Sequence, residues 1–364
     1  MPVTPSLLLS FVGAFCCAQE PGTIETVAGS GAAALTQRAG AARQFNLGQP
    51  FGVEEGPDGA LYVCEVENHR ILRLSPDGAE ITTVVGDGKK GTRGDGEPAV
   101  KAGLDEPYEV RFDADGNLVW VEMRGAVVRR CDRQTGLVTR LVGTGKRGAG
   151  GDGGPGVEAQ LDSPHSIAID GRVALYIADP TAHRIRRLDL RTGVIESVAG
   201  TGAATMPRDG SVATGNPILG PRALHIRDGV LWIALREGNS VWRMDIGTRR
   251  LTHVTGSAQV GFRDGSLSEA LFNGPKGIVA APGGRVFVVD TENQAIRCVD
   301  VLARRVFTVA GGGPKRRGFG GDGGPALDAA LDRPHGIAVL TSGALAIGDT
   351  NNHRVRRVVL APKR

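Results

Sequence analysis

The chain is poor in aromatic residues and cysteine, and it has little net charge. Phe, Trp and Tyr make up 4% of its 364 residues, and no Cys-x-x-Cys pair occurs. A formal net charge of +4 is small for this length, so composition gives no case for a nucleic-acid-binding protein. Glycine is abundant, with 55 residues. This abundance suits many tight turns between short strands and argues against a helical bundle.

The first 18 residues differ from the rest of the chain. Leu7 to Phe15 is an apolar run, followed by Cys16, Cys17 and Ala18. The run is too short for a stable transmembrane helix and is typical of a signal peptide cut after residue 18. We therefore expect residues 1–18 to direct export to the periplasm or the medium, with no transmembrane segment in the mature protein. A lipid anchor through one of the two cysteines is disfavoured, because Phe15 is bulky where such sites carry a small residue.

Three cysteines remain after this cleavage, at Cys64, Cys131 and Cys298. An odd number cannot be fully paired within one chain. We expect them to be small buried hydrophobic residues rather than a disulfide framework or a metal cluster.

A unit of about 57 residues repeats along the chain. Its clearest copy, residues 164–202, contains four short apolar runs, each ended by turn residues, which predicts a four-stranded antiparallel meander. A fixed period of this kind indicates one repeat domain, residues 19–364. The six copies begin near a proline, at Pro50, Pro107, Pro164, Pro221, Pro275 and Pro334.

The two ends of the chain complement each other. Residues 23–31, TIETVAGSG, match the fourth run of other copies, such as IESVAGTG at 195–202, whereas the sixth copy has only three runs. A propeller has to close its ring, and a strand supplied by the N-terminus to the last blade removes an exposed sheet edge. The sequence therefore predicts an all-β, six-bladed propeller of four-stranded blades, closed by the strand at 23–31.

Asp-Gly pairs recur in the loops between the copies. Asp-Gly supplies a turn with positive φ, and the single carboxylate of each loop falls short of the several oxygens that calcium requires. We expect structural turns, with calcium binding as the minor alternative. The aspartates concerned are Asp95, Asp152, Asp209, Asp264 and Asp322.

The second and third runs read ALYVCEVENHRILRL, LYIADPTAHRIRRL, VFVVDTENQAIRCV and ALAIGDTNNHRVRRV. They resemble the NHL-repeat family, in its bacterial secreted type, whose repeat has a G-I-A-V-type first strand, then LYVADT, then N-x-R-I. Copies two and four depart from the pattern, because Glu122 and Leu235 stand where other copies carry Asp179, Asp290 and Asp349. The resemblance implies a six-bladed NHL propeller, a fold that does not by itself fix a function.

Arginine follows these aspartates at regular positions. Arg184 lies five residues after Asp179, and Arg354 five after Asp349, so we expect turn caps with ion pairs. Paired arginines at 129–130, 186–187, 249–250, 304–305 and 356–357 are spread evenly, which predicts a solvated rim. Some NHL propellers bind RNA, but no set of stacking aromatic residues accompanies these charges, and we expect no nucleic-acid partner.

The residue after each leading proline is a candidate for the mouth of the central channel, because the first strand of a blade lies nearest the axis. Two aromatic rings, two imidazoles and two cations would form a concave site for an anionic or carbonyl-bearing ligand. Strict alternation places His165 on the side of Ile167, so it reaches the channel only if its strand begins with a bend. The six residues are Phe51, Tyr108, His165, Arg222, Lys276 and His335, and a second layer contains Glu54, Arg111 and His225.

The motifs PHSI and PHGI, in copies three and six, resemble the histidine motif of the peptidylglycine amidating lyases, NHL propellers in which three such histidines bind zinc. Only His165 and His335 are present here. Zinc needs three or four ligands, so Glu54 or His225 would have to complete the set. We expect no cofactor, with a divalent metal, zinc or calcium, as the minor alternative.

Two functions fit these patterns. The favoured one is an exported, monomeric scaffold that binds a protein, peptide or glycan on its loop-rich face, since the sequence lacks a complete catalytic constellation. The alternative is a small-molecule lyase or lactonase-like hydrolase. In it, His165 or His335 would act as a general base or ligand, and Arg222 or Lys276 would stabilise negative charge.

Overall fold

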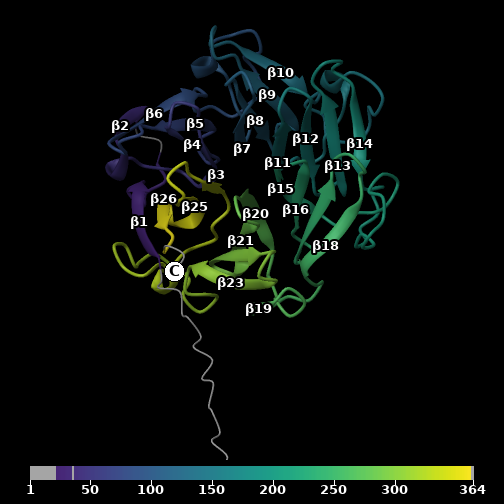
Figure 1. Cartoon of the computed structure of the whole chain (residues 1–364). Helices are drawn as coiled ribbons and strands as arrows, with labels where there is room; N and C mark the ends of the chain where they lie inside the picture. The colour runs from purple at the N-terminus through teal and green to yellow at the C-terminus, as the bar shows by residue number, and fades with distance from the viewer. Residues whose placement is uncertain (1–21, 35–36, 362–364) are drawn as a thin grey trace, which may run out of the picture.

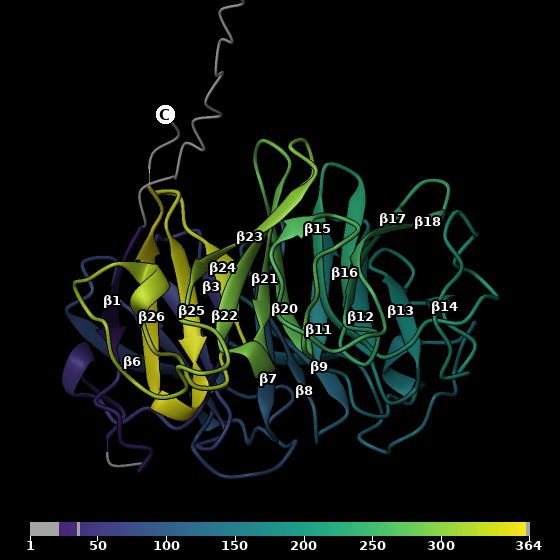
Figure 2. The same cartoon turned by 90° about the horizontal axis from the view of Figure 1, so that it is seen from below.

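The computed structural model describes residues 22–34 and 37–361, so the predicted signal peptide lies outside the described residues. Six antiparallel sheets form a ring around a central axis (Figure 1) and stand side by side when the ring is turned by 90° (Figure 2). The predicted six-bladed propeller is confirmed. Within the described residues, no helix is long and apolar enough to cross a membrane.

The main strands of each blade follow one another from the axis outward. Blade 1 contains β3 (Pro50–Glu55), β4 (Leu61–Glu65), β5 (Arg70–Leu74) and β6 (Glu80–Val85), with β2 (Ala39–Ala41) at its edge. Blade 2 contains β7 (Pro107–Phe112), β8 (Leu118–Glu122), β9 (Val127–Cys131) and β10 (Val138–Val142). Blade 3 contains β11 (Ser166–Asp170), β12 (Ala174–Asp179), β13 (Arg184–Asp189) and β14 (Ile195–Ala199).

The second half of the ring repeats this order. Blade 4 contains β15 (Pro221–Arg227), β16 (Val230–Leu235), β17 (Ser240–Asp245) and β18 (Leu251–Gly256). Blade 5 contains β20 (Pro275–Ala281), β21 (Arg285–Asp290), β22 (Ala295–Asp300) and β23 (Arg305–Ala310), with β19 (Gly265–Ser266) at its edge. Short 3₁₀ helices occupy Ala42–Gln44, Ala99–Lys101, Gly156–Glu158, Thr291–Asn293, Ala326–Asp328 and Thr350–Asn352.

Blade 6 is closed by the N-terminal strand. Its sheet has the order β1 (Thr23–Ala28), β26 (Arg354–Val359), β25 (Leu345–Asp349) and β24 (Ile337–Val339). β1 pairs antiparallel with β26, and Thr23 lies opposite Val359. The predicted ring closure is therefore present, and Ile24 of β1 is buried in the core that blades 5 and 6 share.

The Asp-Gly loops cover the outer strands of the blades that they precede. The amide of Gly96 donates to the Val138 carbonyl at 2.7 Å, and that of Gly153 to the Ile195 carbonyl at 2.8 Å. Both glycines have a φ of 84°, as the Asp-Gly turn requires. The loops thus pair with strand edges that would otherwise be open to other chains.

The arginine pairs correct one of our expectations. Arg129, Arg186 and Arg356 are at most 1% exposed, so one member of these pairs is buried rather than solvated. Arg356 donates to Asp349 at 3.1 Å and to Asp322 at 2.7 Å. Each buried arginine thereby connects its blade to an Asp-Gly loop.

The partner predicted for Asp349 was also wrong. Its ion pair is with Arg356, seven residues on, while Arg354 stacks on the Phe319 ring at 3.7 Å and donates to the Ser30 carbonyl. The Phe319 ring and the loop carbonyl draw the Arg354 guanidinium away from the aspartate.

Blade 3 shows the same departure. Asp179 accepts the backbone amides of Asp162 and Ser163 at 2.7 and 2.9 Å, while Arg184 donates to the Thr201 carbonyl. The turn cap is therefore present, but the predicted ion pair with Arg184 is not formed.

Cysteine adds no cross-link among the described residues. Cys64 and Cys298 are buried in β4 and β22, and Cys131 is half-buried in β9.

Candidate functional site at the channel mouth

Six side chains from the six blades line one small cavity on the axis. Its volume is about 20 Å³, which is room for roughly one water molecule. Protein side chains therefore fill most of the mouth. The six are the residues that follow the leading prolines: Phe51, Tyr108, His165, Arg222, Lys276 and His335.

In blades 1, 2, 4 and 5, a bulge at the start of the first strand aims the side chain after the proline at the axis. The register shifts between Pro107 and Glu109, and again between Pro275 and Gly277, so Tyr108 and Lys276 are extra residues in the pairing. A bulge inserts one residue, bends the strand and redirects a side chain. Blades 3 and 6 show no such shift. His165 and His335 lie just before β11 and β24, so the alternation within those strands does not fix where they point.

An arc of rings in contact with one another fills one side of the mouth. Phe51 stacks on His335 with ring centroids 4.0 Å apart and contacts Tyr108 at 4.6 Å. Tyr108 meets the edge of His165 at 4.8 Å. The Arg222 guanidinium lies 5.5 Å from the Tyr108 ring centroid, a cation–π distance. Arg222 thus reaches across the mouth onto the aromatic arc.

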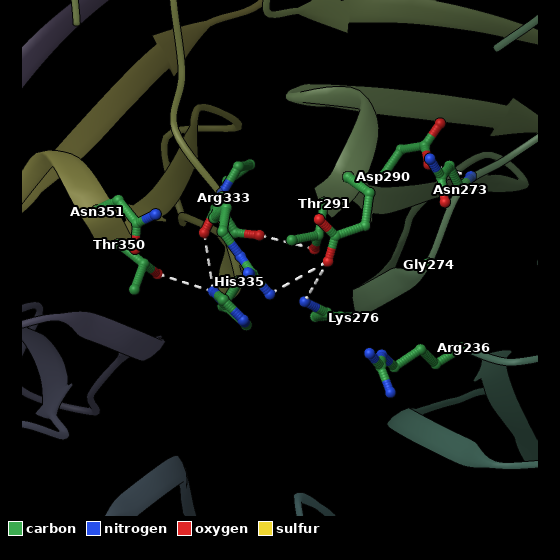
Figure 3. A network of polar contacts seen from close by, with 12 residues as sticks. Arg236, Asn273, Gly274, Lys276, Asp290, Thr291, Arg333, His335, Thr350 and Asn351 are labelled. Atoms are coloured by element: carbon green, nitrogen blue, oxygen red, sulfur yellow. Dashed lines mark hydrogen bonds and ion pairs between the residues drawn. The ribbon is translucent and has the colours of Figure 1, made fainter. Parts of the chain in front are cut away.

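Backbone carbonyls fix both histidines in one tautomer. His165 Nδ1 lies 2.6 Å from the Ser163 carbonyl, and His335 Nδ1 lies 2.8 Å from the Arg333 carbonyl. A carbonyl oxygen only accepts, so Nδ1 carries the proton in each ring. Nε2 remains as the basic nitrogen of both imidazoles. Thr350 also contacts His335 Nδ1, at 2.9 Å (Figure 3).

Burial keeps the two imidazoles neutral. It holds the pKa of His165 well below its usual value, and the nearby Arg222 lowers that pKa further. The pKa of His335 is held down by burial and then by Lys276. Both rings are therefore bases near neutral pH rather than cations.

The two cations of the ring differ in their partners. Burial lowers the pKa of Lys276 to about 8, and its Nζ donates to Glu292 at 2.7 Å. Arg222 is 6% exposed and has a pKa lowered to about 10 by burial, and it has no ion pair within the described residues. In Figure 3, Lys276, His335 and Arg236 face one common space.

The second layer does not join the cavity. Arg111 donates to Glu54 at 3.2 Å and also pairs with Glu109. Burial raises the pKa of Glu54 to about 7 and lowers that of His225 to about 3. His225 Nδ1 accepts the Ala280 amide at 3.3 Å. These residues hold neighbouring first strands together below the mouth.

Sequence reasoning missed two carboxylates of this site. Glu109 lines the cavity and accepts the Ile167 amide at 2.9 Å, and Glu292 pairs with Lys276. Glu109 was missed because the bulge that brings it to the axis depends on the pairing of β7 with β8. Glu292 comes from the turn after β21, for which the linear pattern gave no signal.

The described residues do not form a metal centre at the mouth. No group of three or more His, Cys, Asp or Glu side chains there or elsewhere in residues 22–34 and 37–361 is placed to hold an ion. Glu54 and His225, which would have completed a set with His165 and His335, are engaged by Arg111 and by the Ala280 amide. The residues present therefore do not fit zinc.

A family model now identifies the repeat. The NHL repeat model matches residues 272–299 and 331–358, which fall on blades 5 and 6. The propeller contains NHL repeats. In line with this, it is 27% identical over 238 residues to NHL repeat-containing protein 2 of Gallus gallus, covering 57% of this chain and 32% of that protein.

Other relatives of this NHL propeller are longer proteins. It is 28% identical to Protein SUPPRESSOR OF QUENCHING 1, chloroplastic, of Arabidopsis thaliana over 71% of this chain and 25% of the relative. It is 26% identical to Teneurin-1 of Mus musculus over 93% of this chain and 13% of the relative. The propeller thus spans a third or less of the curated relatives it matches.

Solved structures share the fold at low identity. An auxiliary nutrient binding protein from Bacteroides thetaiotaomicron has a TM-score of 0.66 at 17% identity, covering 94% of this chain and 78% of the other. A gluconolactonase from Xanthomonas campestris has a TM-score of 0.55 at 15% identity, covering 86% of each chain. At this identity the likeness shows the fold alone.

Proposed function

We propose that this NHL propeller is an exported binding scaffold whose channel mouth receives an anionic group of a protein, peptide or glycan. The observation that carries the proposal is Arg222, a buried arginine that forms no ion pair within the described chain. A buried charge is costly unless it is paired. A carboxylate supplied by a ligand completes the pair.

The size of the mouth favours binding on the face rather than inside the channel. A cavity of about 20 Å³ excludes a whole small molecule but not the tip of a side chain or sugar acid. Lys276 lines this cavity with Arg222 and already pairs with Glu292. Arg222 is attracted by Glu109 and Glu237 without forming an ion pair with either in the described chain, so it is the cation of the mouth that can still pair with a ligand. A nutrient-binding protein among the structural neighbours supports a binding role.

The test uses the mature protein, starting at Gln19, and short peptides. A peptide rich in Glu and its Gln counterpart are titrated by calorimetry, and a glucuronate oligosaccharide tests the glycan case. The pair Arg222→Gln/Lys276→Gln is expected to weaken binding of the acidic ligand about 10- to 100-fold, the loss expected for charge-assisted hydrogen bonds.

A matched control removes two positive charges from a site outside the mouth. Arg304→Gln/Arg305→Gln alters two exposed residues, the last of the turn before β23 and the first of β23, away from the mouth, and is expected to keep the affinity. Equal losses in both double variants, or equal binding of the Gln peptide, would overturn the proposal. Export is tested separately, by whether secreted or periplasmic protein begins at residue 19.

The alternative is a lyase or lactonase-like hydrolase at the same mouth. One observation favours it: His165 and His335 are neutral, with Nε2 as the basic nitrogen, and two cations stand beside them. A gluconolactonase is among the structural neighbours. Lactone opening by the wild type that is lost in His165→Ala/His335→Ala would support this function over the scaffold.

A further inference from the structure

A second, larger cavity lies between blades 2 and 3, at the opposite end of the blades from the mouth. Its volume is about 590 Å³, within the roughly 300–1,000 Å³ of small-molecule sites. The turn between β7 and β8, the turn between β11 and β12, and the Asp-Gly loop at 153–157 form its walls. We call it the interblade groove.

The floor of the interblade groove is apolar. It consists of aliphatic side chains from both blades, and Val157 and Val194 at its edge are 46% and 39% exposed. Such a surface gains free energy when an apolar ligand covers it. The floor residues are Val119, Leu141, Ile169, Leu175, Leu188 and Leu190.

One cation in the interblade groove forms no ion pair within the described chain. Arg130 lines it, and its Nε is buried without a hydrogen-bond partner in the described chain. The other two arginines of the lining are engaged: Arg140 pairs with Asp95 at 2.9 Å, and Arg172 with Asp115 at 2.5 Å. Arg130 is therefore the positive charge available to a ligand there.

The lining carboxylates are occupied within the protein. Asp113 accepts the Asn117 amide at 2.9 Å, and Asp189 accepts the Thr192 amide at 2.8 Å. Asp115 is the partner of Arg172. Asp113 and Asp189 therefore cap their own turns, and Asp115 neutralises Arg172.

In two other blades, the arginine equivalent to Arg130 lies opposite a glutamate of the neighbouring outer strand. Arg357, at the same place in blade 6, lies opposite Glu25 and pairs with it. Arg187, in blade 3, lies opposite Glu196 and pairs with it at 3.5 Å. Arg130 lies opposite Thr139, which has no charge to offer.

We propose that the interblade groove binds a small amphipathic monocarboxylate, whose carboxylate pairs with Arg130 and whose apolar body covers the aliphatic floor. Guanidinium matches a carboxylate with two parallel hydrogen bonds. A single unpaired arginine suits one negative charge better than the two of a phosphate monoester. The groove and the channel mouth share no lining residue, so this site is independent of the proposed scaffold function.

The probe is octanoate, with octanol and octylammonium as matched ligands, titrated by calorimetry into the mature protein. We expect octanoate to bind more tightly than either. Arg130→Gln is expected to weaken octanoate about 10- to 100-fold. Thr139→Glu, which restores the carboxylate found opposite Arg357, should weaken it similarly while leaving the groove residues intact.

Arg243→Gln is the matched control. Arg243 lies opposite Thr252 in blade 4 and is not part of this groove, so its loss should leave the affinity unchanged. The proposal is overturned if octanol binds as well as octanoate, if Arg130→Gln and Arg243→Gln lose affinity equally, or if Thr139→Glu binds octanoate like the wild type. Thermal melts of all variants show that each is folded before titration.

Discussion

At the scale of the residue, several blades each contain a buried arginine that connects two segments far apart in the sequence. Arg297, for example, donates to Asp290 in its own blade at 2.8 Å and to Asp264 in the Asp-Gly loop at 2.6 Å. Replacing a whole buried ion pair by apolar side chains is often neutral, but removing one partner leaves an uncompensated charge. The loop aspartates therefore hold their loops against the outer strands.

This role gives the first prediction. Arg356→Met leaves Asp349 buried without its cation and frees Asp322, so it should lower the free energy of unfolding by about 3–5 kcal/mol. Arg316→Met, which breaks an exposed pair with Asp328, should cost at most about 1 kcal/mol. Denaturant unfolding measures both, and equal losses would contradict the proposed role.

The neutral histidines of the mouth predict a pH effect. The pKa values of His165 and His335 in the folded state lie well below the unfolded value of about 6.5, so the unfolded chain binds more protons as the pH falls through 6.5. Each ring then costs up to about 1.4 kcal/mol of stability per pH unit. Glu54 and Asp349, whose pKa values are raised to about 7 and about 6, act in the opposite direction.

A comparison of variants isolates the histidines. His165→Gln/His335→Gln does not titrate, so its melting temperature should fall less than that of the wild type between pH 7.5 and pH 5. Thermal melts across this range test the sign. A variant that loses as much as the wild type would show that the imidazoles are already charged in the folded protein.

At the scale of the element, the first strands nearly touch around the axis. A Cβ added at Gly336 of blade 6 would lie 2.0 Å from the Phe51 carbonyl oxygen in blade 1, whereas one at Gly320 would meet nothing within 4 Å. Gly336 therefore permits the closest approach of these two blades.

Gly336→Ala should force blades 1 and 6 apart. Overpacking of this kind typically costs about 1–3 kcal/mol, and the melting temperature should fall accordingly. Gly320→Ala is the control and should melt like the wild type. If the two variants melt alike, the approach of the first strands is looser than described.

The strands and their order could be predicted from the sequence because each blade repeats a local pattern of apolar runs and turns. The six residues after the prolines could be named for the same reason. The bulges that turn four of them to the axis could not be predicted, since each depends on the register of the first strand against the second. The buried arginines were missed because Arg356 and Asp322 are 34 residues apart, and evenly spaced charge resembles a solvated rim.

At the scale of the whole molecule, histidines join successive blades. His69, His183 and His353 all have a φ near 50°. Each accepts, through Nδ1, the amide of the residue just before the next leading proline, namely Glu106, Gly220 and Gln49 at 3.3, 3.1 and 3.2 Å. The last of these bonds connects blade 6 to blade 1, so the ring is joined by side chains as well as by β1.

Ring closure gives the prediction at this scale. A chain that starts at Gly29 lacks β1, so it exposes the edge of β26 and part of the core around Leu345. It should melt at a lower temperature and associate through that edge, as seen by light scattering. A chain that starts at Gly22 keeps β1 and should stay monomeric. Equal melting and mass for both chains would argue against closure by β1.

The antiparallel pairing of β1 with β26 also sets how the ring responds to force. Thr23 lies opposite Val359, so the outer ends of both strands meet at one point. Tension applied between these two residues would load the hydrogen bonds one after another rather than all at once. The ring would therefore unzip at its seam under low force, and the other five blades, each formed by a continuous segment, would remain folded.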